Sequence, residues 1–94
     1  MTQANAIHNE AVFRRLRNWT LGGLGAMGMS TLLHQMDMQP LATRAAVRAL
    51  LDEGSIVEAG PCGRYYVTSV GIAKYEGAEA AARWKPVLES WGLT

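Results

Sequence analysis

The sequence predicts a single α+β domain that is mostly helical, and three observations support this fold class. The chain has 94 residues, which is enough for one domain with one modest core. Apolar residues recur at helical spacing in most of the chain, whereas residues 55–67 show the pattern of extended structure. Apolar residues make up 49% of the chain and charged residues 18%, which is the balance of a folded domain rather than of a disordered segment.

The first helix is expected from about Asn5 to Trp19. Its side chains Val12, Leu16 and Trp19 fall on one face at helical spacing, as expected for a helix that packs on a core. Four glycines follow within residues 22–28, and we interpret this segment as a mobile linker to the next helix.

The linker also contains a literal G-x-G-x-x-G pattern from Gly23 to Gly28. In a dinucleotide-binding domain this pattern follows a strand, and a second strand presents an acidic residue about 20 residues later. Here a helix precedes the glycines, and residues 41–51, where the second strand would lie, are also expected to be helical. We therefore reject a nucleotide site and expect no cofactor.

Two further helices are expected on either side of a short turn. The first covers Thr31–Met38, with Ser30 as its candidate N-cap. The second runs from residue 40 or 41 to Glu53, because proline suits the first turn of a helix and Gly54 ends it. The inner face of this second helix is expected to consist of Thr43, Val47, Leu50 and Leu51.

A β-hairpin follows, with strands over Ser55–Ala59 and Arg64–Val67 and a turn over residues 60–63. Thr68 is expected to cap a last helix, which Pro86 breaks or restarts. We expect the inner stripe of this helix to be Val70, Ala73, Gly77, Ala80, Ala81 and Trp84, which places Ile72 and Tyr75 on its outer face.

Several classes of site are disfavoured by the sequence. No signal peptide and no membrane-length apolar run is visible, so we expect a cytoplasmic protein without membrane association. The single Cys62 excludes an internal disulfide, and this residue is either an ordinary turn residue or a redox-sensitive thiol near Arg64. His8 and His34 lie far apart and no metal-ligand spacing occurs, so we expect no metal site. No spacing indicates a catalytic triad, and we expect that the chain is not an enzyme.

The charges are unevenly distributed, although the formal net charge is only +1. Residues 1–50 contain five arginines and two acids, a net charge of +3, whereas residues 51–94 contain four basic residues and six acids, a net charge of −2. The basic half is therefore the part of the chain that could face an anion, although an ordinary solvated surface would show the same charges.

From Thr31 to about Tyr75 the expected elements come in the order helix, turn, helix, hairpin, helix. The residues that carry this pattern are Leu32 in the first helix, Met36 and Met38 around the turn, Val47 and Leu50 in the second helix, and Gly54 before the first strand. The run Tyr66-Val67-Thr68-Ser69-Val70-Gly71 at the end of the hairpin also belongs to it, because it matches the motif L-T-x-x-G with valine in place of leucine. In order and spacing, this stretch resembles the winged helix-turn-helix family, particularly the DNA-binding core of MarR-type bacterial transcriptional regulators.

The resemblance divides the single domain 1–94 into four segments: an N-terminal helix with its linker (1–29), the helix-turn-helix (30–54), the wing (55–68) and a C-terminal helical segment (69–94). It implies a small transcriptional regulator, such as a repressor, that binds double-stranded DNA with a recognition helix in the major groove and the wing on the backbone. The residues expected to contact DNA are Ser30, Thr31, Gln39, Arg44, Arg48 and Arg64.

Proteins of this family often dimerise through their terminal helices, so we expect a homodimer. The residues expected at the contact with the other chain are Ile72, Tyr75 and Trp91. Trp91 has a second interpretation, because it could also fold back onto the core of its own chain.

A protein-interaction module is the alternative function. The net charge is near zero, and Leu41, Ala42 and Ala45 stand where regulators of this kind usually place polar residues. Such a module would be an adaptor or an inhibitor of another protein machine that has the same fold and does not bind DNA.

Overall fold

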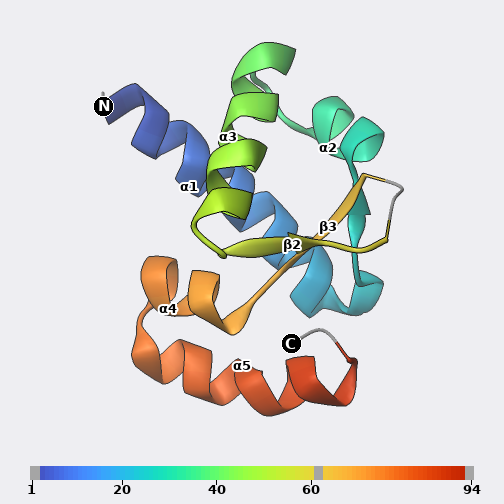
Figure 1. Ribbon diagram of the computed structural model, residues 1–94, viewed down its shortest axis with the longest axis vertical. Coiled ribbons are helices and arrows are strands. Elements are labelled where there is room, and N and C mark those ends of the chain that lie inside the picture. The colour runs from blue at the N-terminus through green and yellow to red at the C-terminus, as the bar shows by residue number, and fades with distance from the viewer. Residues whose placement is uncertain (1–2, 61–62, 93–94) are drawn as a thin grey trace.

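The computed structural model describes residues 3–60 and 63–92, and in these residues the fold is α+β and mostly helical, as predicted. The elements in chain order are α1 (Gln3–Trp19), a π-helical turn η1 (Thr20–Leu24), β1 (Met27–Gly28), α2 (Met29–Gln35), α3 (Pro40–Asp52), β2 (Ile56–Glu58), β3 (Arg64–Val67), α4 (Ser69–Glu76) and α5 (Ala78–Ser90). Figure 1 shows α1 running diagonally through the molecule, with α3 at one end and the α4–α5 pair at the other.

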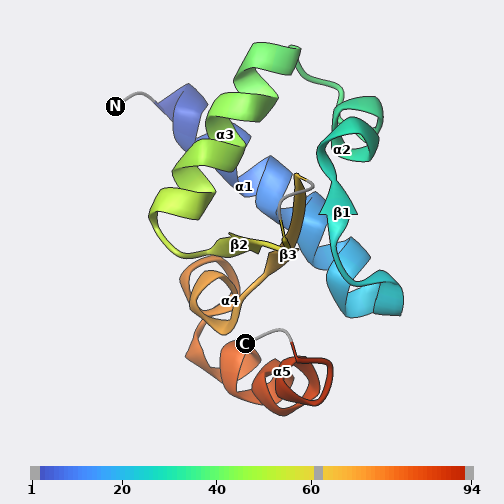
Figure 2. The same ribbon diagram turned by 45° about the vertical axis from the view of Figure 1, so that its right-hand side comes forward.

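The three strands form one antiparallel sheet in the order β1-β3-β2. The predicted hairpin is present: Ile56 pairs with Val67, and Glu58 pairs with Tyr65. The pairing of Met27 with Tyr65 adds the third strand, which was not predicted. Figure 2 shows β1 on the opposite side of β3 from β2, leading directly into α2.

The glycine-rich segment contributes strand β1 to the sheet, whereas the sequence suggested only a linker between two helices. Met27 is fully buried, which anchors the segment in the core. The indole N–H of Trp19 donates to the Ala26 carbonyl (3.2 Å), and the Thr20 hydroxyl donates to the Gly25 carbonyl (2.8 Å). Gly25 has a φ of 73°, a backbone conformation that residues with a side chain rarely adopt, so this position favours glycine.

The boundaries of α2 also differ from the prediction. The helix begins at Met29 and ends at Gln35, and its N-cap is Gly28 rather than Ser30. The cause is the third strand: β1 leads directly into the helix, and the amide of Met29 donates to the Gly63 carbonyl of the hairpin (2.9 Å).

The core contains apolar side chains from every α-helix and strand of the described chain: Val12, Phe13 and Leu16 of α1, Met27 of β1, Leu32 of α2, Ala46, Val47 and Leu50 of α3, Ile56 of β2, Tyr65 and Val67 of β3, Ile72 of α4 and Leu88 of α5. The predicted inner residues Thr43, Val47 and Leu50 of α3 are buried, and Leu51 is half-buried. The core side of this helix is therefore confirmed.

The predicted inner face of the C-terminal helix is wrong for α4 but right for part of α5, where Ala80, Ala81 and Trp84 are half-buried against the core. Ile72 is fully buried, whereas Val70 is 57% exposed, so the outer and inner sides of α4 are exchanged. The reason is that residues 69–90 form two helices: α4 ends at Glu76, and Gly77 turns the chain with a φ of 101°. The predicted stripe is therefore interrupted at Gly77, and Pro86 lies inside α5 instead of ending it.

An ion pair joins the α4–α5 pair of helices to α1. The guanidinium group of Arg17 donates to the carboxylate of Glu76 (2.7 Å) and lies 5.9 Å from the ring centroid of Trp84. The pair is partly buried, so it is less screened by water than a fully exposed pair.

A second polar cluster fixes the junction of α3, β2 and α4. The carboxylate of Glu53 accepts hydrogen bonds from Lys74 Nζ (2.7 Å), from the Tyr75 hydroxyl (2.9 Å) and from the Ser55 hydroxyl. Burial raises the pKa of Glu53, but these hydrogen bonds and the charge of Lys74 outweigh it, so the pKa lies below its ordinary value of 4.5. The folded chain therefore holds Glu53 in its ionised form.

We expect Gly71→Ala to destabilise the protein strongly. A Cβ atom at this position would lie 2.4 Å from the Ser55 carbonyl oxygen and 2.5 Å from Phe13 Cε1. Because one of these neighbours is backbone, we expect the free energy of unfolding to fall by about 2 kcal/mol or more. Urea denaturation followed by tryptophan fluorescence measures this. The control is Gly22→Ala, where an added Cβ meets no atom within 4 Å, and an equal loss in both variants would contradict the prediction.

We expect Glu53→Gln to flatten the dependence of stability on pH. A carboxylate with a lowered folded pKa contributes stability that is complete above its unfolded pKa and is lost as the pH falls through the folded pKa. The wild type should therefore lose stability below about pH 4.5, and Glu53→Gln should be less stable near pH 7 by about 1 kcal/mol, with a weaker dependence on acid. Urea denaturation at several pH values tests this. Asp37→Asn, which removes an exposed carboxylate that lies outside the helices and has no ion pair within the described residues, should follow the wild type.

Candidate nucleic-acid interface

Local sequence sets both ends of α3. Gln39 is the N-cap in an extended conformation, and Pro40 occupies the first turn, where its missing N–H is not needed. The Thr43 hydroxyl donates back to the Gln39 carbonyl (3.2 Å). Glu53 is the C-cap, and Gly54 follows it with a φ of 79°, which ends the helix as predicted. The helix therefore begins at Pro40 and ends at Asp52, within one residue of the prediction.

We use the term outer face of α3 for Leu41, Arg44, Ala45 and Arg48, all of which are exposed. These positions are related as i, i+3, i+4 and i+7, so they lie on one side of the helix. Thr43, Ala46, Val47 and Leu50 are buried on the opposite side. Since this burial fixes the rotation of the helix, both arginines of the outer face project into solvent.

The two arginines of the outer face have no ion-pair partner within the described residues. The three ion pairs found there join Arg14 to Glu10 (2.6 Å), Arg17 to Glu76 and Lys74 to Glu53 (2.7 Å each). Arg64 on β3 is also exposed and without an ion pair in this part of the chain. The predicted DNA-contacting arginines are therefore among the basic residues whose charge remains available to an anion.

Arg44 lies close enough to the hairpin to affect its electrostatics. Burial raises the pKa of Tyr65, the carboxylate of Glu58 raises it further, and the guanidinium group of Arg44 acts in the opposite direction. The structure thus brings Arg44 of α3 and Tyr65 of β3 into one electrostatic environment. A ligand that reached the outer face of α3 at Arg44 would lie near the hairpin.

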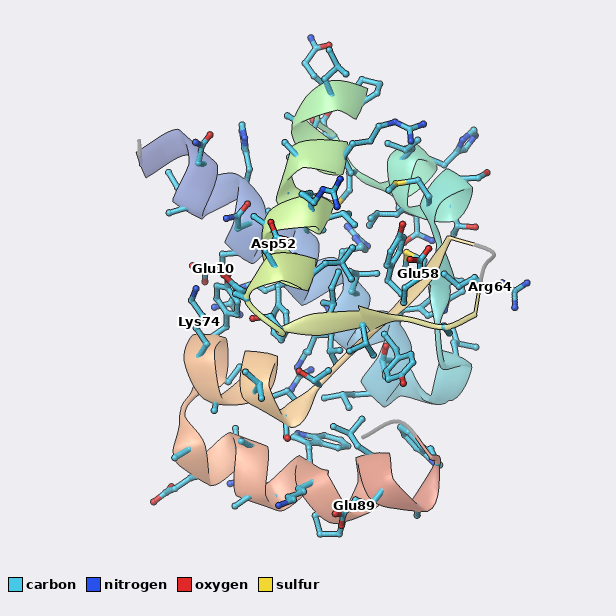
Figure 3. The ribbon with its side chains drawn as sticks, viewed as in Figure 1. Glu10, Asp52, Glu58, Arg64, Lys74 and Glu89 are labelled. Atoms are coloured by element: carbon cyan, nitrogen blue, oxygen red, sulfur yellow. The ribbon has the colours of Figure 1, made fainter. Side chains whose placement is uncertain are left out.

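Acidic residues interrupt the basic surface. Asp52 is exposed at the end of α3, and Glu58 is exposed on β2. In Figure 3, Glu58 lies between α3 and Arg64, and Arg64 points away from the rest of the molecule. Exposed carboxylates of α3 and β2 therefore accompany the basic residues of α3 and β3.

The remaining predicted DNA contacts lie at the starts of two helices. Ser30 is exposed and Thr31 half-buried in the first turn of α2, and Gln39 is exposed at the start of α3. Neither Ser30 nor Thr31 caps α2 through its side chain, so their hydroxyl groups are not used by the helix start. Both line a shallow depression with His34 and Gln35.

Two of the three residues predicted at a contact with another chain are occupied inside this chain. Ile72 is fully buried, which corrects its predicted place on an outer surface. Tyr75 stacks on Phe13, with ring centroids 4.6 Å apart, and its hydroxyl donates to Glu53. Burial, this hydrogen bond and the charges of Glu53 and Glu10 raise the pKa of Tyr75. Trp91, 43% exposed, is the member of the set that remains on the surface.

Sequence inspection did not find the Glu53 cluster. Its members Lys74 and Tyr75 lie more than 20 residues away along the chain, and no local pattern links them to Glu53. The same applies to the ion pair of Arg17 with Glu76. Both contacts arise only when α4 packs against α1 and the end of α3.

The described residues also bear on the other classes of site considered above. The described residues contain no group of three or more His, Cys, Asp or Glu side chains placed to hold a metal ion. Cys62, considered above as a redox-sensitive thiol, lies outside the described residues. Within the described ranges, no helix has both the length and the apolar character needed to span a bilayer.

Comparison with known proteins identifies no relative: no family model, no curated protein and no solved structure matches this chain. The outer face of α3 and its neighbouring hairpin are therefore the basis on which a function is proposed.

Proposed function

We propose that this protein is a winged helix-turn-helix regulator of transcription that binds double-stranded DNA without catalysis. In this proposal α3 enters the major groove and the β2–β3 hairpin meets the neighbouring backbone. The observation that carries the proposal is the presence of Arg44 and Arg48, exposed and without ion-pair partners, on one side of a helix whose other side is buried.

The dimensions of α3 suit a major groove, which is about 12 Å wide and admits one helix. Arg44 and Arg48 are separated by one helical turn, roughly 6 Å along the axis, so both can contact one stretch of duplex. Arginine donates to phosphate oxygens or to the O6 and N7 atoms of guanine. The short strand β1, which joins the hairpin in one sheet, is compatible with a winged-helix-like layout.

A second candidate function is a protein-interaction module, for example an adaptor or an inhibitor of another protein machine. Two observations favour it: Leu41 is 81% exposed on the outer face of α3, and Asp52 and Glu58 lie beside the basic residues. Such a module would bind a single protein stoichiometrically and would not retain nucleic acid after purification. Recovery of that protein complex, together with no duplex binding at low salt, would favour this function over the first.

We also propose that the regulator is a homodimer, because two copies would match a DNA site with two half-sites. The side chain available for this contact is Trp91 at the end of α5. Sedimentation equilibrium of the wild type and of Trp91→Ala tests this, since loss of the dimer in the variant is the expected result and a monomeric wild type would contradict it.

Duplex binding should depend on Arg44 and Arg48. We expect the dissociation constant, measured by fluorescence anisotropy with random-sequence duplexes, to rise steeply between about 50 and about 200 mM salt, because phosphate contacts release counterions. Arg44→Ala combined with Arg48→Ala should weaken binding at least about ten-fold and lower the logarithmic salt slope by about 2.

A double variant that removes the same charge elsewhere is the control. Arg83→Ala with Lys85→Ala removes two exposed basic residues of α5 that have no ion pair among the described residues. Figure 1 shows α5 at the opposite end of the molecule from α3. If this control lost affinity as much as the α3 variant, general charge rather than the outer face of α3 would be responsible. No binding by the wild type at low salt would overturn the proposal.

A further inference from the structure

Leu41 is the most exposed large apolar side chain of the described residues, with 81% of its surface accessible. The other large exposed apolar side chains are Ile7 (63%), Leu24 (62%), Val70 (57%) and Trp91 (43%). A single exposed leucine is ordinary in a folded protein, so its exposure alone indicates nothing. Its position on the outer face of α3 is what distinguishes Leu41.

The start of α3 gains little from a leucine. Leu41 follows Pro40 in the first turn, where an acidic side chain would stabilise the helix by interacting with its positive end. The first turn of α3 contains no acidic residue. Leu41 is not part of the core and is not among the partly buried side chains packed against it. The helix therefore presents an apolar side chain that makes no packing contribution to the fold.

The neighbours of Leu41 on the same face are cationic. Arg44 follows at i+3 and Arg48 at i+7, and neither has an ion-pair partner in the described chain. An apolar protein surface that covered Leu41 would also desolvate these guanidinium groups without pairing them, which is unfavourable. A partner that offers an apolar group beside anionic or hydrogen-bond-accepting groups avoids this penalty.

The major groove of DNA offers this combination. Thymine presents its C5 methyl group there, next to guanine O6 and N7 acceptors and to the phosphates. We infer that Leu41 is a specificity-determining residue that packs on a thymine methyl group, while Arg44 and Arg48 contact bases or phosphates further along the same groove. This inference rests on the proposed DNA-binding function and names what the outer face of α3 reads.

The spacing along the helix is consistent with such a contact. Leu41 and Arg48 are seven residues apart, which is roughly 10 Å along the axis and matches about three base-pair steps. One helix face can therefore carry the thymine contact at its N-terminal end and the arginine contacts beyond it. Ala45, the remaining member of the face, is small enough not to obstruct either contact.

The test uses two pools of random-sequence duplexes that differ by one methyl group per thymine. One pool is made with thymine and the other with uracil at every such position, and each competes with a labelled duplex in an anisotropy assay at low salt. We expect the wild type to bind the thymine pool about two- to four-fold more tightly, as one buried methyl group predicts. Leu41→Ala should bind both pools with equal affinity.

Leu24→Ala is the matched control, because it truncates another exposed leucine, located in η1 rather than α3. It should keep the wild-type preference for thymine. Thermal unfolding should show that neither exposed substitution changes stability appreciably, so a changed preference reflects the contact itself.

Each other outcome overturns the inference in a recognisable way. Equal binding of both pools by the wild type, with a normal salt dependence, would overturn the role of Leu41 and leave DNA binding intact. Persistence of the thymine preference in Leu41→Ala would do the same. Absence of binding to either pool at low salt would overturn the proposed function, and this inference with it.

Discussion

The stacking of Phe13 on Tyr75 is the contact that ties α4 to the central helix α1 and, through Tyr75, to the end of α3. Phe13 is fully buried in α1, and its ring lies against that of Tyr75 in α4 with an interplanar angle of 26°. The Tyr75 hydroxyl in turn donates to Glu53 at the C-cap of α3. One sequence of contacts thus runs from the central helix through α4 to the end of α3, and it relates the candidate interface to the core.

The same region explains why the backbone approaches so closely at Gly71. Phe13 and the backbone of Ser55 occupy the space that any larger side chain at this position would need. α4 can therefore lie directly against α1 and the start of β2. This close approach brings Tyr75 onto Phe13 and places Lys74 and Tyr75 within reach of Glu53.

The division of charges follows from this packing. Arg14, Arg17 and Lys74 are paired with carboxylates, two of them across elements that the core brings together. Arg44 and Arg48 lie on a helix whose neighbours offer them no such partner in the described chain. A formal net charge of +1 therefore understates the basic character of one surface, because the carboxylates are mostly placed elsewhere. Glu58 and Asp52 are the exceptions and limit how far this basic surface extends.

Local sequence was sufficient to predict α1 and α3, the hairpin and the side of α3 that faces the core, whereas the single C-terminal helix that was expected is two helices. Gln39-Pro40 and Glu53-Gly54 mark the ends of α3 through their own backbone preferences, and thirteen residues give the apolar period enough turns to define one face. The structure agrees with the local context on which the G-x-G-x-x-G pattern was judged, because the 17-residue helix α1 precedes it and α3 occupies the place of a second strand. These features depend on residues close together in the chain.

Tertiary packing determines the features that depend on contacts between residues far apart in the sequence. Strand β1 has two residues, too few for any periodic pattern, and it exists because Met27 and Gly28 pair with Tyr65 and Arg64. The face of α4 was predicted wrongly because an eight-residue helix with Val70, Ile72 and Ala73 has apolar groups on more than one side. The buried side is selected by the fit of Gly71 against α1 and β2, a contact between segments far apart in the chain that no local pattern contains.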